Sequence, residues 1–214
     1  SPFVSGAMGT RFMIWDVARQ MKELPKYQKN ADAQLEQGPM GITVLGGAGR
    51  IGNQVCEDLL QLYPIVVAFD KRYEQEEILS LRGGTLIRTS SVRRLSEHSL
   101  FIGLTHHGDV IREWVNYLPA GSLIADDTHP CISLEVREFL AEHQVDTLKI
   151  VLGHEEFSMM PRMPAWNNRD IPGCLVEALV LLENKDEVAN NFELFAAAAT
   201  NAGFKGRLIE PLDE

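Results

Sequence analysis

Residues 41–52 read GITVLGGAGRIG, and this stretch decides the fold. The apolar run at 42–45 predicts a short buried strand, and the glycines that follow it predict a tight turn. Apolar residues then recur at helical spacing, at Ile51, Val55, Leu59 and Leu62. A strand, a glycine-rich turn and a helix in this order are typical of loops that bind the pyrophosphate of a dinucleotide.

The three glycines of this G-x-G-x-x-G pattern have separate roles. Gly47 permits the tight turn, Gly49 lets the backbone approach a pyrophosphate closely, and Gly52 lets helix and strand pack together. The N–H groups at the start of the helix, at Arg50 and Ile51, face the phosphates. We therefore predict that these five residues bind a cofactor.

Asp70 supports the same prediction from the second strand. It closes the apolar run 65–69 and lies 18 residues beyond Gly52, close to the spacing of about 20 in the dinucleotide fingerprint. A carboxylate there can accept hydrogen bonds from both ribose hydroxyls of NAD, whereas Lys71 and Arg72 directly after it suit the extra phosphate of NADP. The sequence predicts NAD(P)H as cofactor and leaves the choice between the two open.

Short apolar strands alternate with amphipathic helices from residue 41 onward, which is typical of a parallel sheet covered on both faces. The predicted strands are 42–45, 65–69, 85–87, 100–104, 123–125 and 148–152. The predicted helices are 51–62, 74–81, 110–117, 134–143, 175–182 and 188–202. We predict an α/β fold, a Rossmann-like doubly wound parallel sheet with additional C-terminal helices.

The domain organisation follows from the same pattern. Residues 1–40 hold a predicted helix at 14–24 and a polar linker at 26–38. One interpretation of these residues is that they are the remnant of a larger substrate domain. Residues 41–214 are predicted to form the dinucleotide-binding domain with its C-terminal helices.

Composition excludes several classes of protein. The 214 residues carry 20 Lys and Arg against 30 Asp and Glu, so the net charge of −10 disfavours a nucleic-acid partner. No run of about 18 apolar residues is present, so we expect no membrane span. The three cysteines fit neither a disulfide framework nor a zinc site, so we expect a cytoplasmic protein without a metal.

Candidates for chemistry follow the ends of the predicted strands, where open α/β sheets bind their ligands. The segments are 105–108, which begins Thr105-His106-His107, then 126–130, which contains His129, and 153–156, which contains His154. Histidine is the usual general acid or base at neutral pH. We predict that Thr105 contacts the cofactor and that His154 transfers a proton.

Cys174 opens a predicted helix directly after Pro172-Gly173. The dipole and the free N–H groups of a helix start favour a thiolate, which is the nucleophilic form of cysteine. A small buried residue at a helix start is the alternative interpretation. Cys56 lies inside the helix after the glycine loop, where packing is its expected role.

Several segments together resemble the C-terminal part of the long-chain acyl-[acyl carrier protein] reductases. In chain order they are 5–10, the glycine loop, 153–157, 173–178 and 202–205. The resemblance implies reduction of an acyl thioester to an aldehyde with NAD(P)H, through an acyl-cysteine on Cys174. It also implies acyl carrier protein or a CoA thioester as partner. The family has a sizeable domain where this chain has about 40 residues, and its closing histidine is Asn201 or Ala202 here.

Two other functions stay open. The chain is also similar to prephenate and shikimate dehydrogenases, in which case His106 or His129 performs acid–base chemistry on a small hydroxy acid and Cys174 is a core residue. A Rossmann unit without a substrate domain can also sense nucleotides without catalysis. A homo-oligomer is compatible with each function.

Overall fold

The computed structural model describes residues 6–24, 26, 41–161, 166–184 and 186–211. These form two compact units, a larger one over Ala18–Lys149 and a smaller one that combines Ser1–Val17 with Ile150–Glu214. This division differs from the predicted boundary at residue 41, because the chain after residue 149 groups with the N-terminal helix. The predicted linker at 26–38 lies outside the described residues apart from Lys26.

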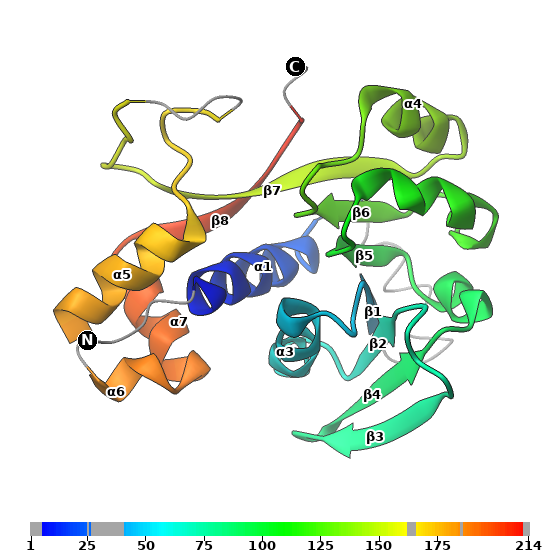
Figure 1. The fold of residues 1–214 in the computed structure, drawn as a ribbon, viewed down its shortest axis with the longest axis horizontal. Helices are drawn as coiled ribbons and strands as arrows, with labels where there is room; N and C mark the ends of the chain where they lie inside the picture. Colours follow the sequence, from blue (N-terminus) through cyan, green and yellow to red (C-terminus); the bar gives the residue numbers. More distant parts are fainter. Residues whose placement is uncertain (1–5, 25, 27–40, 162–165, 185, 212–214) are drawn as a thin grey trace. The chain divides into compact units, whose positions relative to one another are not determined.

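The larger unit is built on a mostly parallel sheet, in which the central strand β1 pairs with β2 on one side and β5 on the other (Figure 1). The strands run in the order β3-β4-β2-β1-β5-β6-β7. Their bounds are Glu77–Leu81 (β3), Gly84–Thr89 (β4), Ile65–Phe69 (β2), Gly41–Leu45 (β1), Leu100–Gly103 (β5), Leu123–Asp126 (β6) and Asp146–His154 (β7). Since the order reverses beside β1, the carboxyl ends of β1 and β5 flank a topological switch point, where such sheets bind ligands. The predicted Rossmann-like fold is confirmed.

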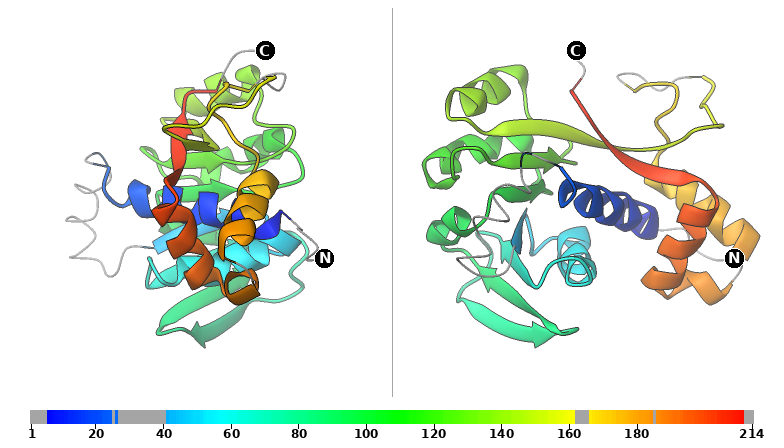
Figure 2. Two further views of the ribbon diagram at one scale, coloured as in Figure 1. Left: turned by 90° about the vertical axis from the view of Figure 1, so that its left-hand side faces the viewer. Right: turned by 180° about the vertical axis from the view of Figure 1, so that it is seen from behind.

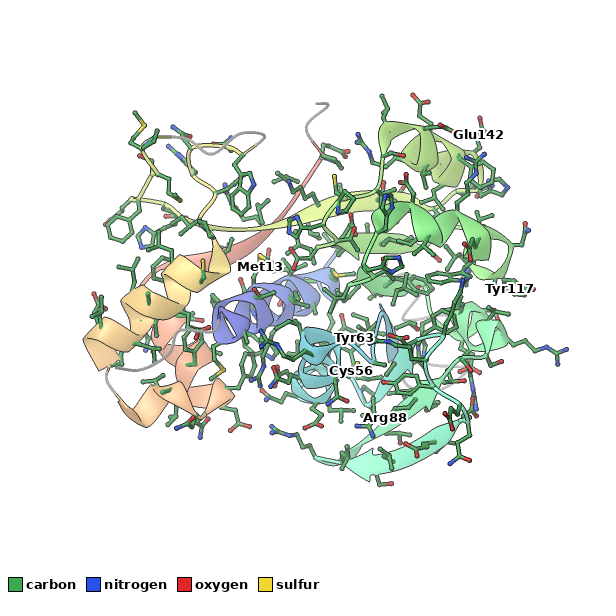
Figure 3. All side chains as sticks on the ribbon, in the orientation of Figure 1. Met13, Cys56, Tyr63, Arg88, Tyr117 and Glu142 are labelled. Atoms are coloured by element: carbon green, nitrogen blue, oxygen red, sulfur yellow. The ribbon has the colours of Figure 1, made fainter. Side chains whose placement is uncertain are left out.

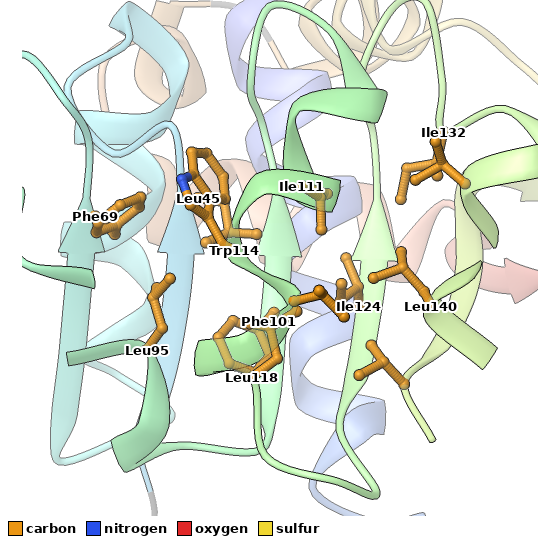
Figure 4. Packing of buried hydrophobic residues seen from close by; sticks show 13 residues of the cluster. Leu45, Phe69, Leu95, Phe101, Ile111, Trp114, Leu118, Ile124, Ile132 and Leu140 are labelled. Carbon is orange, nitrogen blue, oxygen red and sulfur yellow. The ribbon is translucent and has the colours of Figure 1, made fainter. Parts of the chain in front are cut away.

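One face of this sheet carries a hydrophobic cluster (Figure 4). Strands β1, β2, β5 and β6 each contribute one residue to it, and the 3-10 helices η1 (Val92–Glu97) and η2 (Gly108–Tyr117) cover it with helix α4 (Leu134–Glu142). The edge of Trp114 from η2 meets Phe69 with ring centroids 5.0 Å apart. This pair closes the core directly below the carboxyl end of β2.

Helix α3 (Arg50–Leu59) packs against β1 and β2 through side chains that are not part of this cluster. Its buried face includes Val55, Cys56 and Leu59, and Figure 3 labels Cys56 on the helix. Tyr63, just beyond the helix, is fully buried and donates a hydrogen bond from its hydroxyl to the carbonyl of Ala18 at 2.7 Å. The glycine loop therefore leads into a helix that is firmly held.

The predicted helix at 74–81 is wrong. Residues 77–81 form β3, which pairs antiparallel with β4. Arg82 and Gly83 join the two strands with φ values of 50° and 78°, and two left-handed residues make the tight turn that suits the twist of a hairpin. The Gly83-Gly84 pair was the signal for this turn. The sheet thus gains an antiparallel edge strand that the alternation of strands and helices did not predict.

The smaller unit contains the first part of α1 (Ala7–Met21), with α5 (Gly173–Asn184), α6 (Asp186–Ala189), α7 (Phe192–Asn201) and strand β8 (Phe204–Ile209). The predicted helix at 188–202 is divided, because Asn191 caps α7 by accepting the N–H of Leu194. Figure 2 shows α7 leading into β8, which is the neighbour of β7. No strand was predicted at 204–209.

None of the helices among the described residues is long and apolar enough to cross a bilayer.

Candidate functional site

The turn after β1 requires glycine at Gly46, one residue before the predicted position. Gly46 has a φ of +92°, and a Cβ atom there would lie 2.5 Å from the carbonyl oxygen of Leu104. Gly47 instead packs against β2, where a Cβ atom would lie 2.7 Å from that of Ala68. Both backbone N–H groups donate to the carbonyl of Phe69, at 2.9 and 3.1 Å. The loop is thereby fixed to the carboxyl end of β2.

The other two glycines differ in the space around them. A Cβ atom at Gly52 would lie 2.3 Å from the carbonyl oxygen of Gly46, so this glycine serves packing, as predicted. At Gly49 the nearest atom to a Cβ is the same oxygen at 3.2 Å, and the next is Nη2 of Arg72 at 3.8 Å. Gly49 is the N-cap of α3 and provides no side-chain cap. The first N–H groups of α3, including those of Arg50 and Ile51, have no acceptor within the helix. The loop therefore has room and donors for an anion in front of Gly49.

Asp70 lies at the end of β2 with its carboxylate already hydrogen-bonded. Its Oδ2 accepts the N–H of Ala48 in the glycine loop at 3.1 Å. Its Oδ1 accepts both the backbone N–H and the Nε–H of Arg72 at 3.0 Å, and Nη2 of Arg72 donates to Oδ2 at 2.9 Å. Burial alone raises the pKa of Asp70, but the bonds from Arg72 and Ala48 outweigh it and lower the pKa. Asp70 is therefore an ionised, clamped carboxylate.

A cleft with a volume of about 470 Å³ opens beside this carboxylate. Phe69, Leu104, Val110 and Trp114 supply its apolar lining. Its polar lining includes Asp70, Lys71, Arg72, Thr105 and His106. An apolar slot with a few polar groups at its edge is the usual form of a small-molecule site.

Thr105, which we predicted to contact the cofactor, lines this cleft after β5. Its hydroxyl donates to the carbonyl of His107 at 2.8 Å. The side chain of His107 caps η2, since its Nδ1 accepts the N–H of Asp109. His106 is exposed beside them. Of the predicted residues, the structure therefore gathers the glycine loop, Asp70 and Thr105 at one end of the sheet.

The end of β6 carries two adjacent carboxyl groups, Asp126 and Asp127, whose surroundings differ. Asp126 is buried, and its oxygens accept the N–H and hydroxyl of Thr128 and the N–H of Ile132, at 2.7 to 3.2 Å. Asp127 follows with its side chain 14% exposed, and its Oδ1 lies 3.9 Å from Nε2 of His129. Burial and the charge of Asp126 raise the pKa of Asp127 to about 8, although Lys149 opposes the shift. This arrangement can hold or release a proton near neutral pH, and the sequence analysis did not single out Asp127.

Cys174 and His154, the predicted catalytic pair, belong to the smaller unit. Cys174 is exposed in the first turn of α5. The Nε2 of His154 lies 2.7 Å from the carbonyl oxygen of Ala202, and its Nδ1 accepts the N–H groups of Glu156 and Phe157. These bonds require a neutral ring with the proton on Nε2. Both ring nitrogens of His154 are thus used by the backbone, which favours a structural role.

Glu177, also on α5, explains how this helix is anchored. Its buried Oε2 accepts the N–H of Met8 at 2.8 Å and that of Gly9 at 3.4 Å, so the carboxylate caps the start of α1. The two helices touch closely, because a Cβ atom at Gly9 would lie 1.9 Å from the carbonyl oxygen of Gly173. Gly9, Gly173 and Glu177, which lie in two of the segments that carried the family resemblance, therefore have packing roles within the smaller unit.

Among the described residues, no group of three or more His, Cys, Asp or Glu side chains is arranged to hold a metal ion.

No protein-family model matches the chain, and no curated protein matches it either. Several solved structures are similar in fold. A D-isomer specific 2-hydroxyacid dehydrogenase from Lactobacillus delbrueckii ssp. bulgaricus, in its NAD complexed form, is 12% identical with a TM-score of 0.46, over 91% of this chain and 64% of that one. L-tryptophan dehydrogenase from Nostoc punctiforme is 14% identical with a TM-score of 0.45, over 91% of this chain and 52% of that one.

A third example is 3-hydroxyisobutyrate dehydrogenase from Mycobacterium tuberculosis. It is 18% identical with a TM-score of 0.41, over 53% of this chain and 40% of that one. The chain thus spans between two fifths and two thirds of the lengths of these three proteins. At these identities and TM-scores, the chain shares with these proteins a general similarity of fold.

Proposed function

We propose that the chain binds a nicotinamide dinucleotide, NADH or NADPH, and is the cofactor-binding part of an oxidoreductase. The cleft beside the glycine loop carries this proposal. It combines an open backbone at Gly49, a helix start without a side-chain cap and an apolar slot that ends at Asp70 and Arg72. The pyrophosphate, the adenosine ribose and the adenine ring of a dinucleotide are linked in that order, and the helix start, Asp70 with Arg72, and the apolar slot match them in turn.

The residues fit the parts of such a cofactor in chemical terms. The N–H groups that begin α3 would bind the pyrophosphate, and the lining formed by Phe69, Leu104, Val110 and Trp114 would hold the adenine ring. Asp70 and Arg72 lie where the adenosine ribose would end. The bound nicotinamide would supply or accept a hydride, while this chain holds the cofactor in place and excludes water from its adenine half.

For the substrate we propose a small hydroxy acid, oxidised without a covalent enzyme intermediate. Oxidation of a hydroxyl group requires a base that takes its proton. His129 follows the end of β6 and is suited to this role as a histidine, and its Nε2 lies 3.9 Å from Oδ1 of Asp127. The backbone also binds both ring nitrogens of His154. This favours hydroxy-acid oxidation over thioester reduction, which needs His154 as proton donor.

Titration with NADH and NADPH, followed by cofactor fluorescence, tests the cofactor proposal. We expect binding of at least one of them below millimolar concentration. Gly49→Ala should weaken it at least tenfold, because a methyl group would occupy the approach of the pyrophosphate. The melting temperature should change little, since the new Cβ meets only one atom closer than 3.4 Å. Absence of binding of both dinucleotides to the wild-type chain would contradict the proposal.

A second candidate is thioester reduction through Cys174, which the exposure of this thiol in the first turn of α5 favours. Mass spectrometry after incubation with an acyl-CoA tests it, with Cys174→Ala as the variant. Cys56 is the internal control, because it is buried and burial raises the pKa of its thiol. An adduct on Cys174 would favour the thioester reaction. Turnover of a hydroxy acid by a Cys174→Ala variant would favour the first candidate, and binding without any turnover would favour a nucleotide sensor.

A further inference from the structure

The Asp70–Arg72 pair occupies the place where the two cofactors differ. Arg72 donates from Nε to Oδ1 of Asp70 and from Nη2 to Oδ2, so one edge of the guanidinium covers both carboxylate oxygens. Oδ2 also accepts the N–H of Ala48, and Oδ1 accepts the backbone N–H of Arg72. Each oxygen thus has two donors, which matches the lone pairs that a carboxylate oxygen offers. A ribose diol would find both oxygens already in use.

The guanidinium itself keeps unused donors. It has five N–H groups, and the contacts with Asp70 use the edge formed by Nε and Nη2. Among the described residues, no hydrogen bond from Nη1 of Arg72 is found, and the side chain is 64% exposed. Its Nη2 lies 3.8 Å from the position of a Cβ atom on Gly49. The open edge of the guanidinium is the one that includes Nη1, and the group as a whole lies beside the phosphate-binding loop at the rim of the cleft.

Lys71, the other cation at this point, is engaged elsewhere. Its Nζ bonds the carboxylate of Glu113 at 2.6 Å and lies 5.6 Å from the centre of the Trp114 ring. The lysine charge is thereby balanced by Glu113 on η2, whereas Arg72 is held by Asp70 with donors to spare. Of the two cations after β2, Arg72 is the one arranged to receive a further anion.

We propose that Arg72 selects a 2′-phosphorylated dinucleotide, with Asp70 as the residue that positions it, so that the cleft prefers NADPH to NADH. This proposal rests on the proposed function, since it concerns the same cleft. The 2′-phosphate is bound by the open edge of the guanidinium while the opposite edge stays on Asp70. The low pKa of Asp70, caused by Arg72 and Ala48 against the effect of burial, keeps this pair ionised over the neutral range. Asp70 therefore favours NADPH in this proposal, whereas its position in the sequence indicates NADH.

Calorimetry with two adenine-half probes, 2′,5′-ADP and 5′-AMP, and with NADPH and NADH tests this inference. We expect the phosphorylated member of each pair to bind at least tenfold more tightly to the wild-type chain. Arg72→Ala should weaken the phosphorylated ligands about 10- to 100-fold, the range for loss of a charge-assisted hydrogen-bonded contact, and should weaken the others little or strengthen them. Asp70→Asn should lower the ratio of NADPH to NADH affinity severalfold, because the guanidinium of Arg72 is then no longer held in position.

Lys71→Ala is the matched control, since it removes one positive charge at the neighbouring position. It should change the ratio of NADPH to NADH affinity by less than about threefold. An equal fall in the ratio for Lys71→Ala and Arg72→Ala would overturn the inference, because it would indicate a general effect of charge. Tighter binding of NADH than of NADPH by the wild-type chain would also overturn it while leaving the proposed function intact. Absence of binding by all four ligands would overturn both.

Discussion

Asp70 and Asp127 follow parallel strands of one sheet, yet their surroundings push their pKa values in opposite directions. Burial raises the pKa in both cases, and the difference lies in the partners. Asp70 has hydrogen bonds from Ala48 and Arg72, whereas a second carboxylate, Asp126, stands beside Asp127. The end of β2 therefore holds a fixed negative charge, whereas the end of β6 holds a carboxyl group that titrates near pH 8.

This contrast separates a binding function from a chemical one. A clamped carboxylate has little freedom to exchange protons, but it can orient a guanidinium. A carboxyl group with a raised pKa beside a histidine is suited to proton transfer. The two strand ends can thus be altered independently, and each alteration tests one side of the contrast.

The largest effect should come from Gly52→Ala, which disturbs the loop that helps to hold Asp70. The new Cβ would lie 2.3 Å from the carbonyl oxygen of Gly46, so the loop that presents Ala48 to Asp70 must move. We expect a loss of about 3 kcal/mol in the free energy of unfolding, at the upper end of the usual cost of overpacking, and loss of dinucleotide binding. Urea unfolding and cofactor fluorescence measure the two effects. A variant with wild-type stability would show that the loop tolerates the methyl group.

The glycine spacing sufficed to predict where the glycine loop, the start of α3 and Asp70 lie, because local geometry sets all three positions. The roles of single residues were harder to predict. The position with positive φ is Gly46 rather than Gly47, and a side chain there is also excluded by the carbonyl oxygen of Leu104, which is distant in sequence. The clamp on Asp70 was visible only as an Asp-x-Arg spacing, which states nothing about orientation.

The raised pKa of Asp127 could not be predicted in this way, because it depends on burial and on Asp126. The edge hairpin was missed for a related reason, since a turn of two left-handed residues outweighed the apparent helical pattern at 74–81. Strand β8 was missed because tertiary contacts define it. Gly206 donates its N–H to the buried Asp16 of α1, and a Cβ atom there would lie 2.7 Å from the carbonyl oxygen of Met13.

Asp127→Asn tests the end of β6 through the pH dependence of stability. In the unfolded chain this carboxyl ionises near its ordinary pKa of 3.8, whereas in the folded chain it keeps its proton up to about pH 8. The folded state therefore binds more protons between pH 4 and 8, and stability falls as the pH rises through this range. The difference in free energy of unfolding between the variant and the wild type should therefore shift by about 2 kcal/mol in favour of the variant from pH 4 to pH 8. This value allows for the partial exposure of the side chain and for the opposing charge of Lys149.

Chemical unfolding at a series of pH values measures this gain. Asp109→Asn is a suitable control, because Asp109 lies in the first turn of η2, is less buried than Asp127's neighbour Asp126 and accepts the N–H of Ser133. A gain that stays the same from pH 4 to 8 would contradict the raised pKa of Asp127.

His98 should give the opposite slope. It is buried below β1, with Nδ1 3.1 Å from the hydroxyl of Thr43, and burial lowers its pKa to about 4. The unfolded chain takes up a proton below about pH 6.5 while the folded chain does not, so stability falls as the pH drops from 6.5 to 4. His98→Gln should remove about 2 kcal/mol of this loss. An equal pH dependence of stability for the wild type and for His98→Gln between about pH 6.5 and 4.5 would contradict the neutral buried ring.

The smallest effect should come from Thr128→Val, which tests how Asp126 influences Asp127. The hydroxyl of Thr128 donates to Oδ1 of Asp126 at 2.7 Å, and the backbone N–H groups of Thr128 and Ile132 remain bonded to the carboxylate in the variant. We expect a loss of about 1 kcal/mol at neutral pH, the usual value of one hydrogen bond. Without this donor the pKa of Asp126 rises further, so Asp126 holds its proton to higher pH. Less negative charge then faces Asp127, and its pKa falls. Carboxyl titration by NMR should therefore show the two apparent pKa values moving closer together, and an unchanged titration of Asp127 would mean that burial alone sets its raised pKa.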